Sequence, residues 1–139
     1  MDDRFSDEYE LRLSAVEDDI DELQHVNNLV YLRWSLKAAV SHSSHVGWPG
    51  ARYRAHGAGF IVRSHNIKYR YPAVLGDEIL IRTWIVAMER VSSLRRYDIV
   101  RERDAKLLAR VETNWAFVDF QSLKLQRIPD AIRNAFAPT

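Results

Sequence analysis

Polar and apolar residues alternate along residues 8–16, where Tyr9, Leu11 and Leu13 fall on one side of an extended chain. The residues between them are polar or charged. Because side chains alternate between the two faces of a sheet, this segment is predicted to be a half-buried strand.

A helix is predicted for residues 27–44, with Asn27 or Asn28 able to cap it and with Gly47 and Pro49 ending it. Its apolar residues do not form a single stripe, and they occur on most sides of the helix. A helix of that kind is normally enclosed by the rest of the fold.

From Gly59 onward the apolar pattern changes to a period of two, and turn residues separate the segments. The predicted strands cover residues 60–71, 78–89, 94–103 and 107–120. A short helix follows at residues 129–136. Consecutive strands joined by short turns form an antiparallel sheet, so the sequence predicts an α+β fold in which one curved sheet wraps around the long helix. We expect a single domain over residues 1–139.

Composition removes several classes of function. With 20 Lys and Arg against 19 Asp and Glu, the net charge is +1, which argues against a nucleic-acid partner. The absence of cysteine excludes disulfides, thiolate metal sites and a cysteine nucleophile, and it favours a cytoplasmic location. No apolar run is long enough to predict a membrane span. The glycines fit neither a phosphate loop nor a dinucleotide fingerprint, and no serine lies in a Gly-x-Ser-x-Gly motif.

Two histidines near the end of the long helix, His42 and His45, are three residues apart and could share a metal ion. No further histidine or cysteine lies nearby in the sequence to complete such a site. We therefore expect polar residues that complement the helix dipole, and we predict no metal.

An acidic stretch at residues 17–22 precedes the long helix, and Asp21 lies about six residues before it. The first N–H groups of a helix are unpaired and carry partial positive charge. They could stabilise an oxyanion while Asp21 acts as a base or nucleophile, an arrangement suited to attack on a carbonyl such as a thioester. Asp21 could equally be an acidic residue that only favours the helix dipole.

The segment at residues 19–34 contains the pattern Asp-x-Asp-x-x-x-His-Val-Asn-Asn-x-x-Tyr. This pattern resembles the signature of hotdog-fold thioesterases, which include the 4-hydroxybenzoyl-CoA thioesterase-like group and the plant acyl-ACP thioesterases. Residues 65–78, 113–119 and 127–129 resemble later parts of the same family, so the resemblance covers nearly the whole chain. It implies the hotdog fold, a sheet wrapped around one long helix.

By position, the resemblance implies that Asp21 is the general base or nucleophile and that the backbone N–H of Asn28 polarises the thioester carbonyl. His25 matches a histidine that the plant enzymes are thought to use, although a histidine at this junction can also be a structural cap. The plant enzymes have Asn where Leu23 stands and a Glu where the chain has Pro72. These departures favour a site centred on Asp21.

Candidate substrate-binding residues are Tyr31, Trp48, Arg63, His65 and Lys68. Trp48 follows the helix and could line an acyl pocket, and His65 lies on a strand that can approach a partner subunit in this fold. The basic residues could bind the phosphates of coenzyme A. They could also lie on a solvated face of the sheet, an interpretation that extends to Arg95 and Arg96. The remaining tryptophans, expected in the core, are Trp34, Trp84 and Trp115.

These observations together predict an acyl-CoA thioesterase that needs no cofactor, with an acyl carrier protein as another possible carrier of the acyl group. A wrapped sheet leaves an edge strand to be covered, and the family's acyl pocket lies between subunits, so we expect a homodimer or homotetramer. One alternative is a non-catalytic acyl-CoA-binding protein. Another is a hotdog hydratase or dehydratase. That family carries a segment of the type Gly-Asp-x-Asn-Pro-x-x-His, which Leu23 and Gln24 do not reproduce.

Overall fold

The computed structural model describes residues 4–139, so the first three residues of the expected domain lie outside this description. Its strands are β1 (Tyr9–Ser14), β2 (Ala58–Tyr69), β3 (Glu78–Met88), β4 (Ser92–Arg101) and β5 (Lys106–Asp119). Its helices are the 3₁₀ turn η1 (Glu17–Asp19), α1 (Asn28–His45), α2 (Gly50–His56) and α3 (Asp130–Phe136). Each predicted strand and helix is present, within about two residues at most of its ends. The short helix α2 was not predicted.

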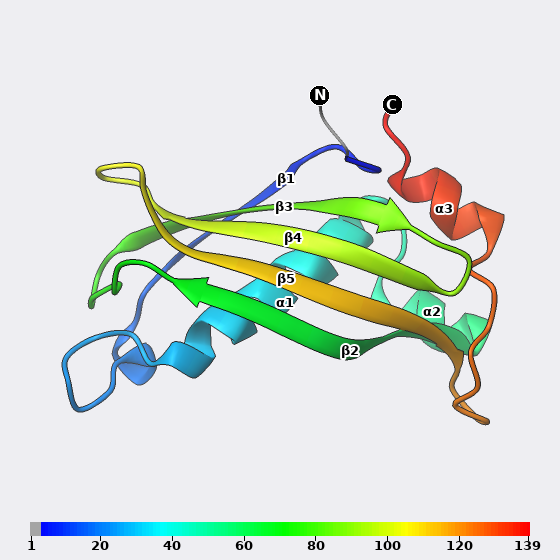
Figure 1. Cartoon of the computed structure of the whole chain (residues 1–139), viewed down its shortest axis with the longest axis horizontal. Helices are drawn as coiled ribbons and strands as arrows, with labels where there is room; N and C mark the ends of the chain where they lie inside the picture. The colour runs from blue at the N-terminus through cyan, green and yellow to red at the C-terminus, as the bar shows by residue number, and fades with distance from the viewer. Residues whose placement is uncertain (1–3) are drawn as a thin grey trace.

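The five strands form one antiparallel sheet in the order β1-β3-β4-β5-β2 (Figure 1). The expectation that consecutive strands are neighbours is therefore wrong for β2, which pairs with β5 instead of β3. Residues 70–77 make the crossing. Eight extended residues reach about 26 Å, whereas three strand spacings require only about 14 Å. A short connection therefore did not require adjacent strands.

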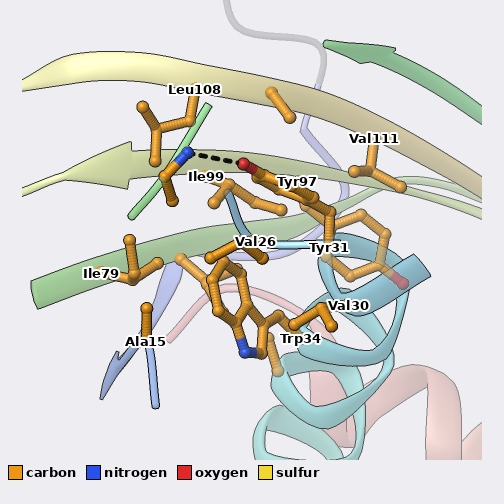
Figure 2. Packing of buried hydrophobic residues seen from close by; sticks show 14 of the residues in the cluster. Ala15, Val26, Val30, Tyr31, Trp34, Ile79, Tyr97, Ile99, Leu108 and Val111 are labelled. Carbon is orange, nitrogen blue, oxygen red and sulfur yellow. Dashed lines mark hydrogen bonds between the residues drawn. The ribbon is translucent and has the colours of Figure 1, made fainter. Parts of the chain in front are cut away.

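Helix α1 runs across one face of the sheet, which we call the inner face (Figure 1). Tyr31 and Trp34 of α1 pack against sheet residues that include Ile79 and Ile99 (Figure 2). The opposite side of α1 is open, because Leu29 is 70% exposed and Val40 is 59% exposed. The expected enclosure of α1 is thus incomplete within the chain, since a single sheet covers only one side of a helix.

A second apolar cluster occupies the other end of the inner face, beside α2 and α3. It contains Trp48, Phe117 and Phe136, and it is separate from the cluster around Tyr31. Trp84 is buried, as expected, but belongs to neither of these two clusters. The guanidinium of Arg4 lies 4.1 Å from the centre of the Trp84 ring. Because the Arg4 cation lies over its ring, Trp84 can be buried outside these two clusters.

The outer face of the sheet carries ion pairs between neighbouring strands. Arg96 Nε lies 2.8 Å from Glu112 Oε2, and Arg110 Nε lies 3.2 Å from Asp98 Oδ1. These side chains are exposed or partly exposed, so each pair stabilises the fold by at most about 1 kcal/mol. Among the helices of residues 4–139, none has the length and hydrophobicity needed to cross a bilayer.

Candidate functional site

The loop before α1 is a tight turn that holds Asp21. Ile20 and Val26 form an antiparallel bridge, and within it the Asp21 N–H donates to the His25 carbonyl at 2.9 Å. Gln24 takes a positive φ of 65° to close the turn. Asp21 Oδ1 accepts the Leu23 N–H at 2.9 Å, which orients the carboxylate and leaves its second oxygen without a partner inside residues 4–139.

The start of α1 assigns different roles to two adjacent asparagines. Asn27 is the cap, because its side-chain oxygen accepts the Leu29 N–H at 2.9 Å. Asn28 is the first helical residue and its side chain is exposed. The Asn28 N–H has no hydrogen-bond partner within residues 4–139. It is the kind of unpaired donor that can hold an oxyanion.

His25 is exposed, and its side chain makes no hydrogen bond to any residue from 4 to 139. The interpretation of His25 as a side-chain cap therefore finds no support in the geometry. Its backbone carbonyl, which accepts from Asp21, is the part that shapes the loop.

Two tyrosines fix the helix start against the sheet. The Tyr69 hydroxyl donates to the Asn28 carbonyl at 3.0 Å, and the Tyr31 hydroxyl accepts the Ala73 N–H at 2.8 Å. Tyr31 is 2% exposed, and burial raises the pKa of its hydroxyl. Tyr31 therefore holds the crossing segment in place.

A cavity of about 260 Å³ lies on the inner face between the second half of α1, α2 and the first residues of β2. It is mostly apolar, and the aromatic side chains on its wall are Trp48, Tyr53, Phe60, Trp115, Phe120 and Phe136. Trp48 thus lines a cavity, as expected for an acyl pocket. The absence of a side chain at Gly59 leaves room for the Phe120 ring, since a Cβ at residue 59 would lie only 2.6 Å from that ring.

Two arginines lie in the wall of this cavity, Arg54 of α2 and Arg95 of β4. Arg54 is exposed, whereas Arg95 is only 4% exposed. Arg95 Nη1 donates to His42 Nδ1 at 2.9 Å and to Thr83 Oγ1 at 3.1 Å. Burial and the Arg95 charge together lower the pKa of His42 to about 3, so His42 is neutral at physiological pH. His42 is therefore a neutral polar residue near the end of α1.

Arg95 belongs to a polar row across the inner face. It pairs in register with Thr113, and Thr113 pairs with His65 on the edge strand β2. His65 Nδ1 lies 2.9 Å from Thr113 Oγ1, and partial burial lowers the pKa of His65. This row lies between the two apolar clusters and reaches from the sheet edge to the cavity wall.

The other basic candidates lie elsewhere. Lys68 lines a polar groove of about 510 Å³ on the outer face, with Arg96 and Arg110. Arg63 is exposed at a β-bulge of β2. The structure therefore does not bring Arg63 or Lys68 together with Asp21 on the inner face, as a shared substrate site would require. Within residues 4–139, no three His, Asp or Glu side chains gather to hold a metal ion.

The interpretation of Arg95 and Arg96 as residues of one solvated face is wrong for Arg95. Adjacent residues of a strand point to opposite faces, so the two cannot both face outward. Arg96 pairs with Glu112 on the outer face, and Arg95 is buried on the inner one. The strand alternation was the signal that could have identified Arg95.

A family model described as the thioesterase-like superfamily matches residues 16–136 of the chain. The long-chain acyl-CoA thioesterase FadM of Escherichia coli (strain K12) is 27% identical over 117 residues, which are 82% of this chain and 86% of that protein.

Solved structures share the same fold. The 1,4-dihydroxy-2-naphthoyl-CoA thioesterase Slr0204 from Synechocystis has a TM-score of 0.87 at 20% identity, with 94% of this chain and 96% of that chain covered. The hypothetical protein SAV2348 from Staphylococcus aureus, solved in complex with CoA, has a TM-score of 0.88 at 12% identity, with 97% and 89% covered.

Proposed function

This chain belongs to the thioesterase-like superfamily and is a thioesterase of the hotdog fold, and we propose that it hydrolyses an acyl-CoA thioester to a free acid and CoA. The relative FadM is named as an acyl-CoA thioesterase, and one structural neighbour was solved with CoA. The observation that carries the proposal is the unpaired N–H of Asn28 at the start of the central helix, next to the loop of Asp21.

In the proposed reaction, Asp21 either takes a proton from water or attacks the thioester carbonyl directly. The carbonyl oxygen gains negative charge as the tetrahedral species forms, and the Asn28 N–H donates to it. A donor of this kind typically stabilises the transition state by about 3–4 kcal/mol. The C–S bond then breaks, and CoA leaves as the thiolate. If Asp21 acts as the base, the proton that it took from water neutralises the thiolate. If Asp21 attacks directly, water then hydrolyses the acyl-aspartyl anhydride, which releases the free acid and restores the carboxylate.

The proposal is tested by thiol release from a panel of acyl-CoA substrates. Asp21→Asn keeps the size of the side chain and an acceptor for the Leu23 N–H, so the loop should stay folded. We expect kcat to fall by at least about 100-fold. The control is Asp18→Asn, an exposed carboxylate of the same acidic stretch, which should leave kcat unchanged. Tight acyl-CoA binding without thiol release from the unaltered protein would instead favour the non-catalytic binding protein.

We further propose that the active form contains two copies of this chain joined through β2. This strand lies at the edge of the sheet, with Ile61 42% and Val62 37% exposed. Edge strands of this length normally need a cover.

Pairing of β2 with β2 of a second copy has a geometric result. If the two-fold axis lies near Ser64 and His65, the Tyr69 end of one strand meets the Phe60 end of the other. Tyr69 contacts the helix start, and Phe60 lines the cavity. The helix start of one copy is then beside the cavity of the other, so a thioester at Asn28 would place its acyl group in the partner's cavity.

A further inference from the structure

The positive charge of Arg95 is not matched by a carboxylate. The ion pairs within residues 4–139 include none that involves Arg95. A buried guanidinium stays charged, and a buried charge normally has an ionised partner. Leaving such a cation unmatched in an apolar region destabilises the folded protein.

The side chains around Arg95 do not supply the missing charge. His42 accepts from Nη1 and is neutral. Tyr53 exchanges a hydrogen bond with Ser43 at 2.9 Å, and burial raises the pKa of both Tyr53 and Tyr97, so both phenols stay neutral. Thr83 has no charge to offer.

The free donors of Arg95 are on its other nitrogens. Both hydrogen bonds made within residues 4–139 use Nη1. The Nε and Nη2 groups have no partner there, yet Arg95 has no nitrogen among the fully enclosed, unpaired polar atoms. These nitrogens therefore keep a small exposed surface, and Arg95 lines the cavity. The planar edge formed by Nε and Nη2 matches a carboxylate in two parallel hydrogen bonds.

We propose that Arg95 binds a carboxylate at the far end of the acyl group, so that the substrates are thioesters of dicarboxylic acids. This inference rests on the proposed function, because it names the acyl class that the enzyme hydrolyses. A dry cavity of 150 Å³ is large enough for benzene, so one of about 260 Å³ has room for roughly ten non-hydrogen atoms. An acyl chain of about eight carbons with a terminal carboxylate has that size.

The first test compares two substrates of equal chain length on the unaltered protein, octanoyl-CoA and the CoA monothioester of octanedioic acid. We expect kcat/KM to be at least about tenfold higher for the octanedioic thioester. A preference for octanoyl-CoA, or equal hydrolysis of both, would overturn the inference while leaving the thioesterase activity established. This comparison needs no variant to fold.

The second test uses Arg95→Met, which removes the charge and keeps an extended side chain. Arg96→Met is the matched control, because it removes the neighbouring arginine on the outer face. Arg95→Met should reverse the preference toward octanoyl-CoA, and Arg96→Met should keep the preference of the unaltered protein. An equal loss of both activities in Arg95→Met would assign Arg95 a structural role and reject the inference.

A binding measurement separates this inference from the proposed function. Trp48 and Trp115 line the cavity, so their fluorescence reports ligands there. The unaltered protein should bind octanoate at least about tenfold more tightly than 1-octanol, and Arg95→Met should bind both equally. If the protein hydrolyses no acyl-CoA but still binds octanoate more tightly than 1-octanol, the thioesterase proposal is rejected and Arg95 is retained as a carboxylate site. Equal binding of octanoate and 1-octanol by the unaltered protein would reject the site itself.

Discussion

At the residue scale, the side chain of Asn27 and the backbone of Asn28 are used for different purposes. Asn27→Ala removes the cap of α1 and should lower the free energy of unfolding by about 1 kcal/mol. Asn28→Ala should leave the free energy of unfolding unchanged. It should change kcat by no more than a few-fold, because alanine keeps the same N–H. Urea denaturation and thiol release measure the two effects.

The two variants serve as controls for each other, since both shorten an asparagine at the same helix end. An Asn28→Ala protein that is folded but as inactive as Asp21→Asn would show that the side chain acts in the reaction. The backbone-amide proposal would then be wrong.

The buried His42 predicts a pH dependence of stability. The unfolded chain protonates His42 near pH 6.5, whereas the folded chain resists protonation until about pH 3. The unfolded state therefore binds more protons between these values, and the free energy of unfolding falls as the pH drops below 6.5. From about pH 7.5 to about pH 5, His42 should account for a loss of about 2 kcal/mol.

Urea denaturation of His42→Asn at these two pH values isolates this contribution. Asn offers a side-chain oxygen close to the position of Nδ1, so the hydrogen bond from Arg95 is kept while the titration is removed. The variant should lose less stability than the unaltered protein over the same interval. Identical losses would mean that His42 is not the group that titrates.

At the element scale, helix α2 begins at Gly50 and is capped by Gly57, and the two glycines have opposite expected responses to alanine. Gly57 ends the helix with φ of 85° in the left-handed region, so Gly57→Ala should lower the free energy of unfolding by about 1 kcal/mol. Gly50 begins the helix in an ordinary conformation, and its new Cβ would meet only the end of the Arg54 side chain at 3.1 Å. Gly50→Ala should therefore leave stability unchanged or raise it by up to about 1 kcal/mol. Thermal unfolding of the pair provides the measurement, and equal shifts in one direction would contradict the assignment.

The elements themselves could be predicted from the sequence far better than their arrangement. Alternation along stretches that are 6 to 14 residues long specifies the strands, and the asparagines mark the start of α1, because both signals are local. The place of β2 beside β5 depends on where residues 70–77 cross, which no local pattern encodes. Helix α2 has seven residues and no buried side chain, so it lacks an apolar stripe to reveal it.

The candidate site also has one part that the sequence could predict and one part that it could not. Asp21, His25 and Asn28 lie within one short segment, and a sequence motif can identify such a group. The cavity is formed by residues from all three α-helices and from β2, β3, β4 and β5, which meet only in the folded chain. Arg95 was therefore missed as a cavity residue, although the alternation of β4 contained the information.

At the scale of the whole molecule, the edge strand predicts the oligomeric state. We expect twice the mass of the 16.2 kDa chain by light scattering at micromolar concentration. Ile61→Lys places a charge on the β2 edge and should yield the single-chain mass, with thiol release greatly reduced because each helix start loses the partner's cavity.

Val16→Lys is the matched control. Val16 is 53% exposed and lies before η1, outside β2. It should keep the double mass and full activity. An Ile61→Lys protein that has the single-chain mass and retains full turnover would show that one chain contains the complete site.

The polar row of His65, Thr113 and Arg95 also affects how chains of this fold can diverge over generations. Cores are close-packed, so a change of volume at one position is normally transmitted to its neighbours. Here the row separates the cluster around Trp48 from the cluster around Tyr31, which supports the helix start. Mutations of the Trp48 cluster that enlarge or reshape the cavity can therefore accumulate without displacing Asn28 on the other side of the row. A lineage with this core is free to acquire new acyl preferences while it inherits the same chemistry.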